Sequence, residues 1–406
     1  MKYLILGGGP AGLIAAYSLL KCNCDSFLLL EAENEAGGLC RSALVDGSPL
    51  DIGGGHFLDV RNPRVNRLLF ELMPESEWNY FQRDSRIRIG NELVHHPFEA
   101  NIWELPETMQ KEYLVSISEA GCNTGRKKPE SFVDWIRWKL GDRIADDYML
   151  PYNRKMFGGR LNDLGTYWLE KLPNVSYEDT LKSCELHRPF GKQPGHACFY
   201  YPKKYGYGEV WLRMAESMSS HIEYGKTANE IDYRTRTVRC TDGSSYTAEN
   251  IIVTVPWTSF TRIGGADSRL SEEISKLSST SVEIGYHPES LNEEAQWIYI
   301  PDPEIKHHRI LIRENFCPGS RGYWTETQTN EPSQKPDSFF NKYAYPLNTI
   351  DKPAAIGFIL DYSAEYGIFG LGRWGEHSHF NSDVTAERAI SLVDRLTNGR
   401  GTFAPA

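Results

Sequence analysis

The 406-residue sequence contains no apolar run that approaches the roughly 20 residues of a membrane-spanning helix. Its eight cysteines include no CxxC pair, which argues against a zinc site or a disulfide framework and favours reduced thiols in a cytoplasmic protein. Acidic residues outnumber basic ones, 54 to 44, so a general nucleic-acid-binding surface is not expected. Long repeats and low-complexity tracts are also lacking. What remains is a globular chain with room for about two or three domains.

Glycines at a fixed spacing dominate the N-terminus. An apolar strand is expected over residues 2–7, and the glycine motif leads from it into a predicted helix over 13–20. The motif GxGxxG comprises Gly7, Gly9 and Gly12, with Pro10 and Ala11 between the last two. These glycines allow a tight turn, close approach of a pyrophosphate, and close packing of helix on strand. A second predicted strand, 27–30, ends at Glu31, which can accept ribose hydroxyls, so the series predicts a Rossmann-type dinucleotide site.

Two further glycine stretches narrow the expected dinucleotide to FAD. The first contains Gly37, Gly38, Leu39 and Arg41, and the second runs Gly53-Gly54-Gly55-His56. This series resembles the second and third FAD-contacting stretches of the amine-oxidase-like superfamily. In those proteins the paired glycines and the arginine lie along the diphosphate, and the Gly-Gly-His stretch passes close to the flavin. The resemblance implies FAD as the cofactor.

Segments in the middle of the chain resemble those that return to the flavin domain in this superfamily. Residues 201–211 resemble the returning stretch itself. Residues 222–238 alternate as in a β-hairpin, and an apolar strand that ends at a proline is expected over 251–256. By this layout, Ala228 or Ile231 is expected to lie near the adenine.

The C-terminal part carries the last expected contacts to FAD. Gly372 and Arg373 precede a predicted helix that begins near Asp383. The positive end of such a helix dipole can face the flavin edge that gains negative charge on reduction. The expected cofactor contacts are Gly7, Gly9, Pro10, Ala11, Gly12, Glu31, Ala32, Gly38, Leu39, Arg41, Gly54, Gly55, His56, Ala228, Gly372, Arg373 and Asp383.

The sequence as a whole predicts an α/β fold with a discontinuous FAD-binding domain, Rossmann-type and glutathione-reductase-like by the same resemblance. Apolar residues at helical spacing predict helices over 104–120 and 132–148, inside an inserted helical region. A mainly antiparallel β domain is expected to bind the substrate. The expected limits are 1–90, 195–265 and 350–406 for the FAD-binding domain, 91–194 for the helical insertion and 266–349 for the substrate domain.

The inserted regions share more specific stretches with one family. In order, residues 95–101, Phe132-x-x-Trp135, Tyr152-Asn153-x-Lys155, Trp168, 297–301, Arg309, 343–346 and 372–383 resemble UDP-galactopyranose mutases, most closely the eukaryotic type. Those mutases interconvert the pyranose and furanose forms of a UDP-hexose. Reduced flavin N5 attacks the anomeric carbon, UDP leaves, and the sugar recloses with the other ring size. The resemblance implies reduced FAD, a nucleotide-sugar substrate and nucleophilic catalysis by the cofactor.

The resemblance also implies roles for residues around the substrate. Arg309 is one diphosphate clamp, because a guanidinium matches phosphate oxygens, and Tyr345 is a second contact. Phe98 and Asn153 lie toward the uridine, and His56 lies near the flavin. The expected substrate contacts are Phe98, Asn153, Phe157, Trp297, Tyr299, Arg309 and Tyr345.

Several positions depart from the mutase pattern. Lys171 is the cation nearest to the place of a second clamp arginine, and it keeps the charge without the bidentate geometry. His377 and His379 stand where the mutases have tyrosines that reach the diphosphate. His96 replaces a tyrosine and Phe157 a tryptophan. Histidines near a flavin can also shuttle protons. Together with the two cations expected at the diphosphate, the candidate catalytic residues are therefore Arg309, Lys171, His56, His377 and His379.

Two other interpretations stay open beside a nucleotide-sugar mutase. An FAD-dependent oxidoreductase of the amine oxidase or protoporphyrinogen oxidase type would take a hydride from its substrate to the flavin, and an aromatic, mostly apolar pocket would favour it. A non-catalytic FAD-binding protein would keep the cofactor motifs without turnover. The other GxGxxG, Gly370-x-Gly372-x-x-Gly375, belongs to the C-terminal stretch already expected to contact FAD. A dedicated NAD(P)H domain is therefore not expected, and an external reductant such as NAD(P)H would have to act at the flavin face.

Overall fold

A parallel sheet gathers strands from distant parts of the chain. The computed structural model describes residues 1–169, 172, 174–191 and 197–397. The sheet order is β10–β2–β1–β14–β21, with every neighbouring pair parallel. The strands span Ile222–Glu223 (β10), Phe27–Leu30 (β2), Tyr3–Leu6 (β1), Asn250–Val253 (β14) and Ile368–Gly370 (β21). All residues of β1 are buried, as expected for a parallel strand covered on both faces, and the α/β class is confirmed.

Helix α1 (Pro10–Lys21) packs on β1 and β2 of this sheet. Around α1 lie α8 (Gly208–Glu216) and α12 (Ser382–Thr397), and α2 (Pro63–Leu72) packs against both of these. α1 begins earlier than the expected residue 13, because Pro10 suits the first helical position, where its missing N–H is not needed. α1 and α12 pack against each other, so the first and last helices of the fold lie side by side.

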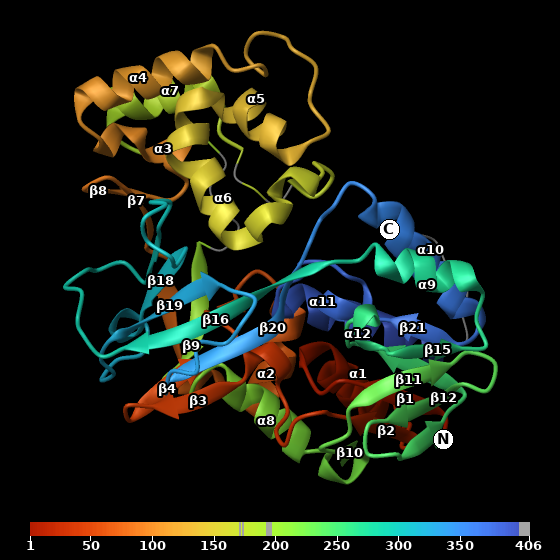
Figure 1. Ribbon diagram of the computed structural model, residues 1–406. Coiled ribbons are helices and arrows are strands. Elements are labelled where there is room, and N and C mark those ends of the chain that lie inside the picture. The colour runs from red at the N-terminus through yellow and green to blue at the C-terminus, as the bar shows by residue number, and fades with distance from the viewer. Residues whose placement is uncertain (170–171, 173, 192–196, 398–406) are drawn as a thin grey trace.

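A second, smaller sheet lies beside the parallel one (Figure 1). Its strands are β11 (Ala228–Asp232), β12 (Thr237–Cys240), β13 (Ser245–Thr247) and β15 (Arg262–Gly264), and the neighbouring helices are α9 (Ser268–Ser275) and α10 (Lys352–Glu365). The hairpin expected over 222–238 is shorter than predicted and consists of β11 and β12. Residues 222–223 instead form β10, which pairs with β2 and extends the parallel sheet at its edge.

The third sheet is the largest and mostly antiparallel. Its order is β20–β16–β19–β18–β17–β7–β8. The strands span Ser338–Pro346 (β20), Ser279–His287 (β16), Tyr323–Gln328 (β19), Arg309–Ile312 (β18), Trp297–Tyr299 (β17), Ser85–Ile89 (β7) and Glu92–His95 (β8). The limit expected at residue 90 falls in the turn of the β7–β8 hairpin. The whole hairpin belongs to this sheet, because β7 pairs with β17.

A helical region lies at one end of the molecule, at the top of Figure 1. It contains α3 (Phe98–Asn101), α4 (Glu107–Ser118), α5 (Phe132–Ile144), α6 (Leu150–Phe157) and α7 (Tyr177–Leu186). The helix expected over 104–120 is shorter at both ends, and that expected over 132–148 passes into a π-helical turn at Ala145–Met149. The region has its own apolar core, which includes Phe98, Phe132 and Ile136.

Small elements join these layers. They are the hairpin β3 (Ser42–Val45) and β4 (Ser48–Asp51), the sheet of β5 (Leu58–Asp59), β9 (Cys198–Pro202) and β6 (Trp78–Gln82), and the short helix α11 (Gly372–Gly375). Within the described parts of the chain, no helix has the length and apolar character needed to cross a membrane.

Candidate functional site

The glycine motif forms a turn that a side chain would block. Gly7 has φ of +103°, a backbone conformation that favours glycine. A Cβ added to Gly12 would lie 1.9 Å from the Gly7 carbonyl oxygen, so α1 can approach β1 only without a side chain there. The carboxylate of Glu31 accepts a hydrogen bond of 2.6 Å from the N–H of Gly8 and so fixes the turn. The turn leaves the N-terminus of α1 open toward a cavity.

This cofactor cavity has a volume of about 420 Å³. Of the expected FAD contacts, it is lined by Gly7, Gly9, Pro10, Ala11, Glu31, Ala32, Gly38, Leu39, Arg41, His56 and Arg373. The sequence did not single out the other lining residues, among them Thr254, Asn341, Trp374, Ser382 and Thr385. Thr254 follows β14 directly, and the carboxyl ends of parallel strands are where ligands of such sheets bind.

The remaining expected FAD contacts lie around this cavity or away from it. Gly12 packs beneath the turn, and Gly372 packs against Ala11. Gly55 and Asp383 line a neighbouring cavity, and Gly54 adjoins Glu326. Ala228 begins β11 and is not among the residues that line the cofactor cavity.

The chemistry of the cofactor cavity suits a dinucleotide. Free N–H groups at the start of α1 and the guanidinium of Arg41 offer donors to phosphate oxygens. Arg373 lies at the far end, where its Nη2 donates to the carbonyl of Phe380 (3.0 Å) and its Nη1 to that of Ala344 (3.3 Å). Glu31 also lines the cavity, as a buried acid that can accept hydroxyl groups of a ribose. An acid, a phosphate cradle and an arginine that line one cavity fit FAD.

His56 lies where the cofactor cavity meets the next one, and it lines both. Its Nδ1 lies 2.9 Å from the carbonyl oxygen of Gly54. Burial, aided by the nearby charge of Arg373, lowers the pKa of His56 to about 4. The imidazole is therefore neutral near pH 7, and its Nδ1 carries the hydrogen toward Gly54.

The next cavity, the arginine cavity, has a volume of about 250 Å³ and brings together residues from many segments. Its lining includes His56, Arg83, Tyr152, Trp297, Tyr299, Arg309, Tyr345, Arg373 and His379. The fold thus brings four expected substrate contacts, Trp297, Tyr299, Arg309 and Tyr345, next to the cofactor cavity. Burial raises the pKa of Tyr345 to about 12, so its hydroxyl remains a hydrogen-bond donor at neutral pH.

Arg309 is held by an acid that the sequence did not reveal. It faces Glu326 across β18 and β19, and its Nε and Nη2 donate to that carboxylate at 2.9 and 2.6 Å. The N–H of Gly55 also donates to Glu326, at 3.2 Å. Burial opposes the charge of Glu326, but Arg309 and His308 outweigh it and hold its pKa at about 2. One carboxylate therefore connects the expected clamp arginine to the loop that carries His56.

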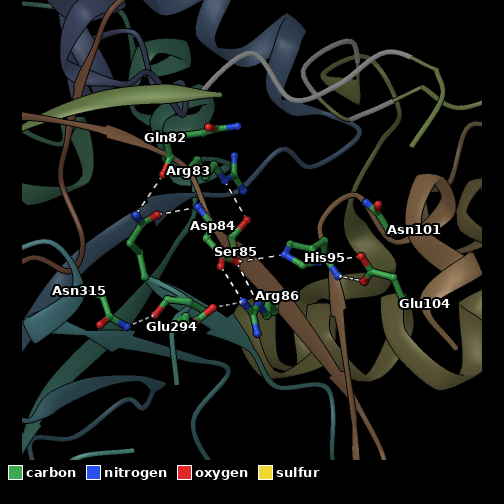
Figure 2. A network of polar contacts seen from close by, with 12 residues as sticks. Gln82, Arg83, Asp84, Ser85, Arg86, His95, Asn101, Glu104, Glu294 and Asn315 are labelled. Carbon is green, nitrogen blue, oxygen red and sulfur yellow. Dashed lines mark hydrogen bonds and ion pairs between the residues drawn. The ribbon is translucent and has the colours of Figure 1, made fainter. Parts of the chain in front are cut away.

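Arg83 is a second guanidinium in this cavity, and sequence reasoning missed it. Its Nη2 donates to the Tyr299 hydroxyl at 3.1 Å, and its guanidinium lies 4.9 Å from the ring centre of Trp297. Its Nε donates to the Ser85 hydroxyl at 2.9 Å, as Figure 2 shows. No carboxylate of the described residues forms an ion pair with it, since neighbouring Asp84 pairs with Arg86 at 2.8 Å instead. Its positive charge is thus free to meet an anion.

A third cavity, the aromatic cavity, lies between the helical region and the C-terminal segment, with a volume of about 460 Å³. Its lining includes Phe98, Glu99, Phe132, Trp135, Tyr148, Tyr152, Asn153, Phe157, Trp168, Tyr299, Lys352 and His379. Three expected substrate contacts, Phe98, Asn153 and Phe157, are therefore here. Because Tyr152, Tyr299 and His379 also line the arginine cavity, the two cavities adjoin.

His377 is buried and does not line these cavities; its Nε2 lies 3.0 Å from the carbonyl of Ser278, and burial lowers its pKa to about 4. Lys171 lies outside the described residues. A cation that was not expected, Lys352, lines the aromatic cavity and donates to Asn348 at 2.6 Å and to the carbonyl of His377 at 2.7 Å.

Comparisons with known proteins show which family this chain resembles in sequence and in fold. Residues 10–282 match the family of flavin-containing amine oxidoreductases. A structure of reduced UDP-galactopyranose mutase is similar over 98% of this chain and 94% of that one, with a TM-score of 0.87 and 22% identity, which shows a shared fold.

Curated relatives match over shorter stretches. Coproporphyrinogen III oxidase of Mycobacterium leprae (strain TN) is 40% identical over 73 residues, 18% of this chain. Putrescine oxidase of Kocuria rosea is 27% identical over 156 residues, 35% of this chain. The matches span only 16% and 32% of the lengths of these relatives. The family match covers more than half of the chain: this protein belongs to the flavin-containing amine oxidoreductases and is an FAD-dependent enzyme.

Proposed function

We propose that this enzyme interconverts the pyranose and furanose forms of a nucleotide sugar, with FAD in the cofactor cavity and the substrate across the other two. The proposal rests on three adjoining cavities. One suits a dinucleotide, one contains Arg83 and Arg309, and one is lined by aromatic rings. A nucleotide sugar has a matching order of sugar, diphosphate and base. The similarity in fold to UDP-galactopyranose mutase supports the same function.

The two arginines would hold the diphosphate. Arg309 keeps its orientation through Glu326, and Arg83 keeps its own through Tyr299 and Ser85. Preorganised guanidinium groups bind phosphate oxygens strongly, and they would retain the nucleoside diphosphate after it leaves the sugar. The hydroxyl of Tyr345, protonated at neutral pH, would add a further donor.

The sugar would lie near His56, at the boundary with the cofactor cavity. In its reduced form, FAD supplies there a nucleophilic nitrogen, N5, for the anomeric carbon. Neutral His56, its Nδ1 turned to Gly54, would present Nε2 as a hydrogen-bond acceptor to a sugar hydroxyl. His379, whose ring centre lies 5.0 Å from that of Tyr345, is placed to move a proton in the same cavity. Lys171 remains a proposed second cation for the diphosphate.

A second function has one observation in its favour. The aromatic cavity would also suit an apolar or amine substrate, and putrescine oxidase is among the relatives. In that case the enzyme would take a hydride from the substrate to the flavin. Arg83 and Arg309 weigh against it, because paired guanidinium groups suit an anionic substrate better than an amine.

The test is to incubate dithionite-reduced, FAD-loaded enzyme with a panel of nucleotide sugars and to determine the ring form of the products by NMR. A furanose product from a pyranose substrate, absent with the oxidised enzyme, is expected. Anaerobic mixing of the oxidised enzyme with amines is the counterpart. Bleaching of the flavin by an amine, together with no ring change for any sugar, would favour the oxidoreductase. An external donor such as NAD(P)H can be tested in the same assay as the source of electrons.

A further inference from the structure

The aromatic cavity contains a carboxylate without a partner, and we propose that it selects the base of the substrate. Glu99 lies in the short helix α3 and lines this cavity. Among the described residues, none forms an ion pair or a side-chain hydrogen bond with it. This inference rests on the proposed function, since it names the nucleotide that the second and third cavities would bind.

The environment makes an unpartnered carboxylate costly. Burial raises the pKa of Glu99, and only its own N–H and the more distant charge of Lys139 oppose that effect. Phe98, Tyr148 and Trp135, which line the same cavity, are buried aromatic side chains that cannot neutralise a charge. Glu99 is itself partly buried, and a ligand with N–H donors would replace the hydrogen bonds to water that the cavity restricts.

Other acids of the same segment have partners. Glu104 accepts from the backbone N–H and from Nδ1 of His95, at 2.8 and 2.7 Å, as Figure 2 shows. Asp84, at the start of the neighbouring strand, pairs with Arg86. Glu99 thus differs from its neighbours, because no other side chain among the described residues donates a hydrogen bond to it.

The shape of the cavity suits a nucleobase. Aromatic side chains line it, and base–aromatic stacking contributes to binding whichever base is present. Stacking therefore explains affinity, and the edge of the base must explain selectivity. The side chain of Asn153 donates one amide N–H to the carbonyl of Met149 at 2.7 Å, and it carries no charge. Glu99 is the charged acceptor that remains.

A carboxylate fits guanine better than the other bases. Guanine presents two adjacent N–H groups, at N1 and N2, which match the two oxygens of a carboxylate. Uracil presents one N–H between two carbonyl oxygens that a carboxylate would repel, and adenine and cytosine each place an acceptor beside their amine. The ligand assigned to the aromatic cavity is therefore a guanosine diphosphate sugar.

The experiment measures GDP, UDP, CDP and ADP binding to the reduced, FAD-loaded enzyme by isothermal titration calorimetry. We expect GDP to bind about 5- to 150-fold more tightly than UDP, the range for one bidentate base contact. Glu99→Gln keeps the size of the side chain and should remove most of this preference. Glu104→Gln is the matched control and should leave the ratio unchanged.

The outcomes separate this inference from the proposed function. Tighter binding of UDP than of GDP, or a GDP to UDP ratio that Glu99→Gln leaves unchanged, overturns the role of Glu99 while a nucleotide-sugar function stands. No binding of any of the four diphosphates overturns both. Retention of FAD by each variant, read from its flavin absorbance, shows that a changed ratio does not come from misfolding.

Discussion

The cofactor cavity and the arginine cavity lie side by side and are built differently. The phosphate cradle of the cofactor cavity uses backbone groups of a short continuous stretch, Gly7 to Gly12, with one acid nearby in the chain. The arginine cavity uses side chains from many segments, and its two guanidinium groups, Arg83 and Arg309, are more than two hundred residues apart in sequence. A site built from backbone tolerates no added atom, whereas a site built from side chains can be altered group by group.

The largest expected effect is at the backbone site. Gly12→Val places side-chain atoms against the Gly7 carbonyl, and overpacking of this kind costs roughly 1–3 kcal/mol or more. The turn has to open, so we expect the purified protein to lack FAD, measured as loss of flavin absorbance. Gly357→Ala is the control, because nothing lies within 4 Å of an added Cβ there. Normal flavin content in Gly12→Val would contradict the distinction between the two cavities.

The next effect should separate substrate binding from stability. Arg309→Ala removes charge-assisted hydrogen bonds to phosphate, so we expect about a 10- to 150-fold loss in nucleoside diphosphate affinity with FAD retained. It also leaves Glu326 buried without its partner, which costs roughly 3–5 kcal/mol of the free energy of unfolding. Adding Glu326→Gln should recover part of that stability and none of the affinity. Calorimetry measures the nucleoside diphosphate affinity, and urea unfolding measures the free energy of unfolding. If Glu326→Gln restored the affinity together with the stability, the separation of binding from stability would be contradicted.

The same ion pair predicts a dependence of stability on pH. The pKa of Glu326, about 2 in the folded protein, is below the ordinary value of 4.5 for a glutamate, so its contribution is complete above pH 4.5. That contribution, of about 3 kcal/mol, is lost as the pH falls toward 2. In acid unfolding of wild type and Glu326→Gln, the wild type should lose more stability between these pH values. Equal slopes would show that the pair does not titrate with folding.

Arg83→Ala should have a smaller effect on affinity than Arg309→Ala. Arg83 has no acid partner among the described residues, so its removal strands no buried charge. We expect a loss of nucleoside diphosphate affinity of about 5- to 30-fold, with little change in the free energy of unfolding. Arg83→Lys, which keeps the charge, should recover part of the affinity. A loss of FAD in this variant would show that the two cavities are not independent.

The smallest effect on binding is expected at His377, which the fold turns away from the cavities. His377→Asn keeps a residue type that tolerates the φ of 46° at this position. Loss of the contact to Ser278 should cost about 1 kcal/mol of stability. Nucleoside diphosphate affinity should not change. A clear loss of affinity would return His377 to the list of residues that act on the substrate.

Much of the fold could be predicted from local pattern. The strand over 27–30 and the α/β class are confirmed, because buried parallel strands and GxGxxG turns have signatures within one short segment. The limit expected at residue 90 lies between β7 and β8, which pair with each other. No local pattern marks the sheet to which this hairpin belongs, since β7 joins it through β17, a partner two hundred residues away. Arg83 had no local signal for the same reason.

By itself, the sequence determined that this protein binds a dinucleotide, and which short stretches form the cradle. A backbone cradle needs only neighbouring residues with the right steric freedom, and these are visible as glycine spacing. The tertiary structure alone decided that Arg309 pairs with Glu326, because that pair follows from the register of β18 on β19. It also decided that Arg83 lies beside Trp297 and that Glu99 lines the aromatic cavity without a partner side chain among the described residues. Side-chain charges meet only when distant segments pack, so their partners cannot be read from spacing along the chain.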